Sequence, residues 1–167
     1  SLPQLEPAPN TPISKIAPAP SGSSEAARRL LSMSSPLKGS LAATYLAGRG
    51  ITDLRDIGAL KFHPNCYYRG QGEAQTETWP AMIAAVTDLE GKLTGAHRTW
   101  LARDGGSKAP VDTQRKAMGD LLGHAVRFGA AKEVMAAGEG IETVLSLRQA
   151  LPKMPMVAAL SAGHLAA

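Results

Sequence analysis

The sequence predicts an α/β fold, in which a mixed subdomain of helices and strands precedes a strand–helix–strand (βαβ) unit. The βαβ unit is predicted because residues 134–137 are a short apolar run like a buried strand, while apolar residues within 141–151 recur at helical spacing. Another apolar run, "MVAAL", follows, and a crossover between parallel strands is right-handed. The stretch "PAMIAAVTDLEGKLTGAHRTWL" holds two β-prone runs around a turn at Gly91, which predicts a β-hairpin in the mixed subdomain.

Composition divides the chain into three parts. Residues 1–23 carry six prolines and few large apolar groups, so we expect a disordered linker. We expect residues 24–130 to form the N-terminal α/β subdomain and residues 131–167 to form the βαβ part. With 167 residues, of which 44% are hydrophobic, the chain is long enough for one sizeable core or two small ones.

Local signals predict the elements of residues 24–130 in order. Ser23 or Ser24 is suited to cap a helix over "SSEAARRLLSM". A second helix fits "SPLKGSLAATYLAGRG" and would end at Gly48 or Gly50. The segments "ALKFHP" and "CYYRG" indicate brief strands, and "HAVRFG" indicates another. Residues 103–120 are predicted to be a glycine-rich, basic connection.

The second strand of the predicted hairpin alternates between two faces. Successive side chains of a strand point to opposite sides, so neighbouring residues are presented to different surroundings. One face carries Leu93, Gly95, His97 and Thr99, and the other carries Thr94, Ala96, Arg98 and Trp100. Whichever face is exposed, the hairpin can present Arg98 from a rigid sheet.

The cysteine count and the hydropathy pattern exclude several classes of protein. Cys66 is the single cysteine, so the chain can form neither an internal disulfide framework nor a zinc ribbon. No apolar run approaches the roughly 18 residues of a membrane span, and no secretory signal is visible. We therefore expect a cytoplasmic protein with no membrane partner.

Positive charge is concentrated in the middle of the chain. The formal net charge is +4, and residues 92–132 hold eight lysines and arginines against three aspartates. Such a stretch attracts polyanions, of which nucleic acid is the commonest. A solvated basic face without a ligand accounts for the charge equally well.

Glu139 lies between two glycines, where the first strand of the βαβ unit gives way to its helix. In open α/β sheets ligands bind at the carboxyl ends of strands, so this carboxylate is placed to face a site. The alternative is an acid that complements the dipole at the start of the helix, a contribution of under about 1 kcal/mol.

The order of these motifs resembles Toprim-type DNA primases, in particular the primase-like proteins of plasmids and phages, and more distantly the bacterial replicative primase. The resemblance runs from about Leu41 to the end of the chain. It rests on the motifs "YLAGRGI", "FHP", the hairpin with its following arginine, "SKAP", "GEGIETVLSL" and "AALSAGHL", which occur in the family's order.

The resemblance implies that residues 131–167 are the N-terminal part of a Toprim domain, in which Glu139 is the catalytic glutamate and a Mg²⁺ ligand. Full-length primases of this kind synthesise primers on single-stranded DNA by Mg²⁺-dependent nucleotidyl transfer. The family's second metal motif, Asp-x-Asp, would lie beyond Ala167, so we expect this chain to be inactive alone. Thr143 stands where replicative primases have aspartate, as in the plasmid and phage branch.

The resemblance also implies that the N-terminal subdomain binds template and primer through basic residues. The predicted nucleic-acid-binding residues are Arg98, Lys108, Arg115, Lys116, Arg127 and Arg49. For Arg49, contact with the last carbonyls of its helix is an alternative. Glu142 is expected to be an exposed acid of the first helical turn, and core packing is favoured over base stacking for Trp79 and Trp100.

The expected partners are a single-stranded DNA template, nucleotides, and a fused or associated helicase. Two other functions stay open: a nucleic-acid-binding module that retains the Toprim fold without catalysis, and a Toprim nuclease of the topoisomerase and repair kind. An Asp-x-Asp pair after the next strand would favour an enzyme.

Overall fold

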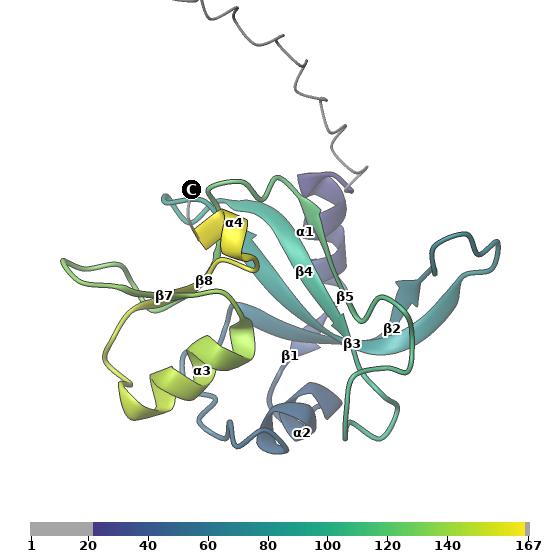
Figure 1. Ribbon diagram of the computed structural model, residues 1–167, viewed down its shortest axis with the longest axis horizontal. Coiled ribbons are helices and arrows are strands. Elements are labelled where there is room, and N and C mark those ends of the chain that lie inside the picture. Colours follow the sequence, from purple (N-terminus) through teal and green to yellow (C-terminus); the bar gives the residue numbers. More distant parts are fainter. Residues whose placement is uncertain (1–21, 166–167) are drawn as a thin grey trace, which may run out of the picture.

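The structure is a computed structural model, which describes residues 22–165 of the chain (Figure 1). Helices and open sheets are mixed along the chain, which confirms the predicted α/β class. Nearly all of the linker predicted for residues 1–23 lies outside the described residues. Among residues 22–165, no helix is both long and apolar enough to cross a bilayer.

The strands form two sheets. The larger is antiparallel and has the order β1 (Ser35–Pro36), β2 (Leu60–Tyr68), β3 (Glu77–Thr87), β4 (Leu93–Trp100) and β5 (Arg115–Gly119). The smaller has the order β6 (Val126–Phe128), β8 (Met156–Ala158) and β7 (Ala136–Gly138). The helices are α1 (Ser24–Ser32), α2 (Leu41–Ala47), α3 (Ile141–Ala150) and α4 (Ala162–Leu165).

Capping serines mark the starts of the first two helices. α1 begins where the sequence predicted it, whereas α2 is shorter than predicted, because Ser35 and Pro36 of the expected helix pair with β2 as strand β1. The side chain of Ser23 caps α1 by accepting a hydrogen bond from the Ala26 amide. Ser40 caps α2 in the same way, and α2 ends at Gly48. Gly50 follows with a φ of 76°, a conformation that glycine adopts without steric cost.

The predicted hairpin is confirmed as β3 and β4, with Gly91 at a φ of 80° in the turn. Two other predictions need correction. The expected pair of brief strands is one strand, β2, interrupted by a bulge between His63 and Cys66. The predicted basic connection contains a strand, β5, which its charged residues do not favour and which forms by pairing with β4.

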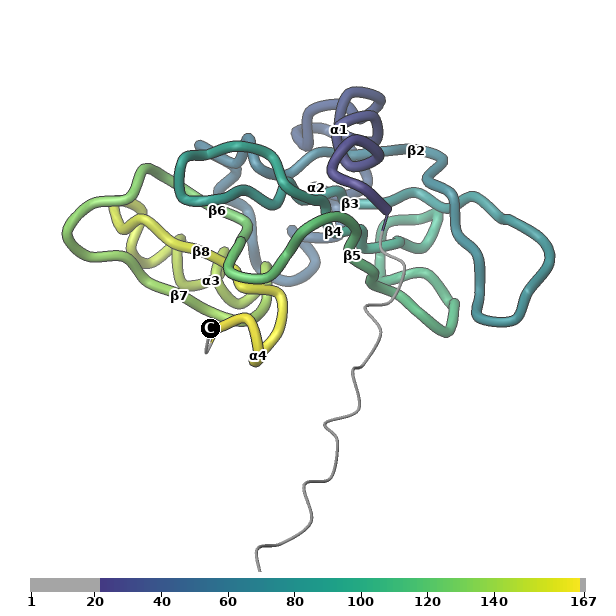
Figure 2. Tube along the Cα trace, turned by 90° about the horizontal axis from the view of Figure 1, so that it is seen from above, coloured from purple at the N-terminus to yellow at the C-terminus, as the bar shows by residue number. Residues whose placement is uncertain are grey.

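The larger sheet buries a different apolar cluster on each face. Ala81 and Ile83 pack with α1, whereas Met82 and Ala84 pack in the cluster that includes α2 and α3. Figure 2 shows α1 on one side of the strands and α3 on the other. We call these the α1 face and the α3 face.

The βαβ unit is confirmed: β7 and β8 are parallel, and α3 connects them. β6 lies within the predicted N-terminal subdomain in sequence, yet it pairs with β8 in the smaller sheet. Phe128 of β6 and Leu145 of α3 belong to the same apolar cluster as Leu46 of α2. The two sheets therefore share one core, with the smaller sheet at one end of the molecule and the β2–β3 hairpin projecting at the other (Figure 1).

Gly95 and Gly119 allow β4 and β5 to approach closely. A Cβ on Gly95 would meet the carbonyl oxygen of Met118, and a Cβ on Gly119 would meet the backbone of Thr94 and Gly95. Neither clash is with a flexible side-chain end, so the backbone itself would have to move. Glycine is required here for packing, in addition to the φ of 94° at Gly119.

We expect Gly95→Ala to destabilise the fold by about 1–3 kcal/mol, because the new methyl group has no space beside β5. Urea unfolding followed by circular dichroism measures the change. The control is Gly58→Ala, where nothing lies within 4 Å of the added Cβ, and its effect should stay within about 1 kcal/mol. Equal effects of the two substitutions would contradict the close approach of these strands.

Candidate functional site

Glu139 directly follows β7, at the carboxyl end of the parallel strand pair. Gly140 is the N-cap of α3, and the carbonyl oxygen of Glu139 accepts a hydrogen bond from the Leu160 amide at 2.8 Å. The Glu139 side chain is exposed, and within residues 22–165 its carboxylate has no hydrogen bond or ion pair. The strand end therefore presents a carboxylate that is available to a ligand.

A cavity of about 240 Å³ opens at Glu139 and lies between the two sheets. Its walls come from β4, β5, the first turn of α3 and the segment after β8. The lining residues are His97, Arg115, Glu139, Gly140, Ile141, Glu142, Thr143 and Leu160. Residues more than 40 positions apart in the sequence thus meet around one small polar space.

Glu142 is tied to α2 across this junction. The Tyr45 hydroxyl donates a hydrogen bond of 2.8 Å to its Oε1. Burial raises the pKa of Glu142, but the Tyr45 bond and the charges of Lys108 and Arg115 outweigh burial, so the pKa is lowered overall. Burial and the same carboxylate raise the pKa of Tyr45. The expectation of an exposed first-turn acid is wrong, because α2 covers this side of α3.

Arg49, Lys108 and Arg115 gather around the Tyr45–Glu142 pair, and we call them the basic cluster. The Arg49 guanidinium lies 4.0 Å from the centre of the Tyr45 ring. Burial lowers the pKa of Lys108, and the nearby charges of Arg115 and Arg49 lower it further, against the opposite effect of Glu142. Three of the six predicted nucleic-acid-binding residues therefore lie around Glu142, which lines the cavity at Glu139.

Arg98 and Lys116 lie on the other face of the sheet. They are directly opposite each other in the β4–β5 ladder, one position away from the pair formed by Thr99 and Arg115. The Arg98 guanidinium lies 5.0 Å from the centre of the Trp100 ring on the α1 face. The alternation of β4 thus separates these two predicted residues from Glu139.

Arg127 takes part in neither group. Its Nε donates a hydrogen bond of 3.1 Å to the carbonyl oxygen of Asp88, in the turn between β3 and β4. Arg127 is absent from the lining of the cavity at Glu139. Its contact holds the hairpin turn against β6, which is a structural role.

His97 lines the cavity from β4, although no motif in the sequence marked it as a site residue. It is buried, and its Nδ1 has no hydrogen-bond partner among the described residues. Burial, followed by the charge of Arg115, lowers the pKa of His97 to about 4. The ring is therefore neutral near pH 7 and adds a polar group to the cavity without adding charge.

The described residues do not make a complete Mg²⁺ site. Within residues 22–165, no group of three or more histidine, cysteine, aspartate or glutamate side chains is placed to hold a metal ion. Glu142 is engaged by Tyr45, which leaves Glu139 as the available carboxylate of the cavity. Because Mg²⁺ gives up its water ligands reluctantly, one exposed carboxylate is a weak site.

The low pKa of His97 predicts a loss of stability in acid. The unfolded histidine, with an ordinary pKa near 6.5, binds a proton that the folded protein excludes down to about pH 4. Stability should therefore fall by about 2–3 kcal/mol as the pH drops from 7 to 4.5. Urea unfolding at both pH values measures this, and His97→Gln should lose that part of the pH dependence. An unchanged dependence in His97→Gln would contradict the burial of a neutral ring.

Comparison with known proteins gives a family but no activity. Residues 21–128 match the family described as Domain of unknown function (DUF7146), and the match spans the larger sheet, both N-terminal helices and β6. No curated protein and no solved structure shows significant similarity to the chain. Since the matched residues make up more than half of the sequence, the protein belongs to the family Domain of unknown function (DUF7146).

Proposed function

We propose that the α3 face binds the phosphate backbone of single-stranded DNA, as part of a Toprim-type primase of the plasmid or phage kind. One observation carries the proposal: the basic cluster of Arg49, Lys108 and Arg115 gathers beside the cavity that opens at Glu139. Three of the motifs on which the family resemblance rests, "YLAGRGI", "SKAP" and "GEGIET", supply Arg49, Lys108 and Glu139.

The charges of the cluster favour an anionic ligand. Glu142 accepts the Tyr45 hydroxyl, so it is already engaged within the protein. Lys108 is half-buried, and its lowered pKa reflects burial together with the repulsion of Arg115 and Arg49. A bound phosphate would relieve that repulsion, because it adds negative charge where three cations converge.

Nucleotidyl transfer is proposed for the full-length protein only. There Mg²⁺ would be the cofactor, Glu139 one of its ligands, and single-stranded DNA and nucleotides the substrates. The carboxylate at the carboxyl end of β7 supports that role through its position and its lack of a partner within residues 22–165. The described residues do not complete a metal site, so catalysis would need further ligands from the full-length protein.

A binding module without catalysis is the second candidate. It requires only the basic cluster around the Tyr45–Glu142 pair and no metal. In that case the basic cluster would hold a strand and Glu139 would have no metal to bind. Strand binding on the α3 face is common to both candidates, so it is tested first.

Replacing Arg49, Lys108 and Arg115 together by glutamine should weaken binding to a fluorescent single-stranded oligonucleotide. Affinity for a single strand falls with salt with a slope of about 0.7 per phosphate contact, so the slope should shrink by up to about 2. Fluorescence anisotropy across a salt series measures both quantities. The control replaces the exposed residues Lys92, Lys132 and Lys153 by glutamine, which removes the same charge elsewhere. Equal losses of affinity in the two triple variants would show that the basic cluster contributes only as general surface charge.

In the full-length protein, Glu139→Gln should lower Mg²⁺-dependent primer synthesis by at least about 100-fold, since the amide keeps the shape but loses the ligand charge. Incorporation of labelled nucleotides measures the activity, and circular dichroism checks the fold. Glu133→Gln, which alters an exposed acid just before β7, is the matched control. Full activity in Glu139→Gln would reject the Toprim assignment and leave the binding module.

A further inference from the structure

Two adjoining cavities form a groove on the α1 face, and we call it the α1-face groove. Their volumes are about 480 and 360 Å³, which is within the range of pockets that bind small molecules. The two cavities share the lining residues Tyr68, Arg69, Trp100 and Lys116. Arg98 lines the larger one. The groove therefore lies on the opposite face of the sheet from the candidate functional site.

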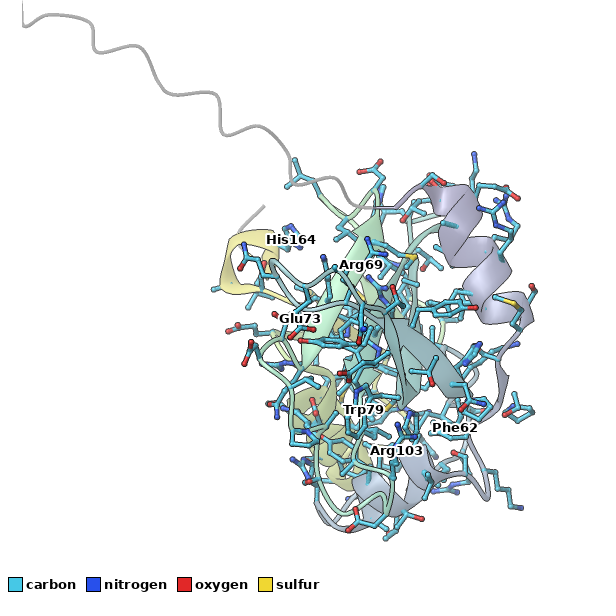
Figure 3. All side chains as sticks on the ribbon, turned by 90° about the vertical axis from the view of Figure 1, so that its right-hand side faces the viewer. Phe62, Arg69, Glu73, Trp79, Arg103 and His164 are labelled. Atoms are coloured by element: carbon cyan, nitrogen blue, oxygen red, sulfur yellow. The ribbon has the colours of Figure 1, made fainter. Side chains whose placement is uncertain are left out.

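Positive charge in the α1-face groove has no acidic partner. Arg69, Arg98 and Lys116 line the groove, and no aspartate or glutamate does. Within residues 22–165, Arg98 and Lys116 have no hydrogen bond or ion pair, and Arg69 donates to a neutral threonine hydroxyl at 3.0 Å. Arg69 and Glu73 both belong to the projecting hairpin (Figure 3), but Glu73 lies against Gly70 and lines neither cavity.

Arg98 is the enclosed cation of this groove. Its side chain is half-buried, and its Nε is buried without a hydrogen-bond partner among the described residues. Its guanidinium lies 5.0 Å from the centre of the Trp100 ring, which attracts the charge but is a poor acceptor for its N–H groups. Burial lowers the pKa of Arg98, because it disfavours the charged form. An anion beside the guanidinium would supply both the opposite charge and the missing acceptors.

Lys116 adds a second cation at a fixed position. It is directly opposite Arg98 in the β4–β5 ladder, on the same face of the sheet. Like charges directly opposite each other in an antiparallel pair are destabilising, because their Cβ atoms are only about 5 Å apart. Backbone pairing thus holds two cations side by side, and an anion between them would replace their repulsion by attraction.

The aromatic rings of the groove offer no surface on which bases could stack. Tyr68 and Trp100 are 5% and 2% exposed, and they pack edge to face with their ring centres 5.0 Å apart. Tyr67 is exposed, but the alternation of β2 places its side chain on the opposite face from Tyr68. Single strands are bound through exposed rings as well as cations. The groove therefore favours a compact ligand in which negative charge is concentrated.

We propose that the α1-face groove binds a polyphosphate chain, either inorganic or belonging to a nucleotide. Arg98 and Lys116 hold one phosphate group between them, and Arg69 contacts the next from the hairpin. The inference goes beyond the proposed function and does not rest on it, because it concerns the other face of the sheet. A nucleotide bound here is distinct from the nucleotide substrate proposed for the full-length protein.

Nuclear magnetic resonance of the 167-residue chain tests the site, with sodium tripolyphosphate as the probe. The Nε–H signal of Arg98, assigned by its absence in Arg98→Lys, should shift as the probe is added. Lys116→Gln should raise the concentration that gives half of this shift by about fivefold or more, because a charge-assisted contact is lost. The matched control is Arg115→Gln, which removes the neighbouring exposed charge from the other face and should change that concentration by less than about twofold.

Adenosine triphosphate is the second probe and separates the two sources of a polyphosphate chain. If it half-shifts the Arg98 signal at the same concentration as tripolyphosphate, the chain alone is recognised. If it does so at a lower concentration, the groove also contacts the nucleoside. Either result supports the site.

Three outcomes overturn the inference. They are an Arg98 signal that does not move, equal effects of Lys116→Gln and Arg115→Gln, or a thymidine oligonucleotide without terminal phosphates that shifts the signal at a lower concentration than tripolyphosphate. The proposed function fails separately, through unchanged strand binding in the triple variant of the basic cluster. If that variant loses strand affinity while the Arg98 signal stays unmoved by tripolyphosphate, the proposed function stands and the groove fails.

Discussion

The register between β4 and β5 decides what each face of the larger sheet presents. Arg98 lies opposite Lys116, and the next pair along the ladder, Thr99 and Arg115, faces the other way. A slip of one residue in β5 would exchange Arg115 and Lys116 between the faces, because side chains alternate with a period of two. The close approach of Gly95 to β5 resists such a slip, since a bulkier residue brought to that place would not fit.

The position of Glu139 depends on how α3 is held. At its start, Glu142 accepts the Tyr45 hydroxyl of α2. At its end, Gln149 accepts from the Thr52 amide and donates to the Gly50 carbonyl, and Arg148 donates to the carbonyl of Arg55. These bonds join α3 to α2 and the loop after it, and polar bonds fix direction more narrowly than apolar packing does. The turn that carries Glu139 is thus held against the basic cluster.

Short sequence patterns predicted those elements whose structure is set by residues close together in the chain. The cap at Ser23, the turn at Gly91 and the βαβ unit were all visible in short stretches of sequence. The strand β5 was not, because its charged residues become a strand only beside β4. The division of the basic residues between two faces also escaped prediction, because it depends on the register of β5. The Tyr45–Glu142 hydrogen bond joins residues 97 positions apart, and no local sequence pattern predicts such a pair.

Exposed cations on β5 have an explanation that involves no ligand. β5 is an edge strand, and charged side chains on an edge discourage pairing with another chain. That requirement is met by Arg115 and Lys116 in the exposed positions they occupy. It does not account for Arg98, which belongs to the interior strand β4 and whose half-buried side chain has no hydrogen bond or ion pair within residues 22–165. Nor does it account for Lys108, which lies outside the strands and is half-buried beside two other cations. The case for anion binding on each face therefore rests more on these two enclosed charges than on the total number of basic residues.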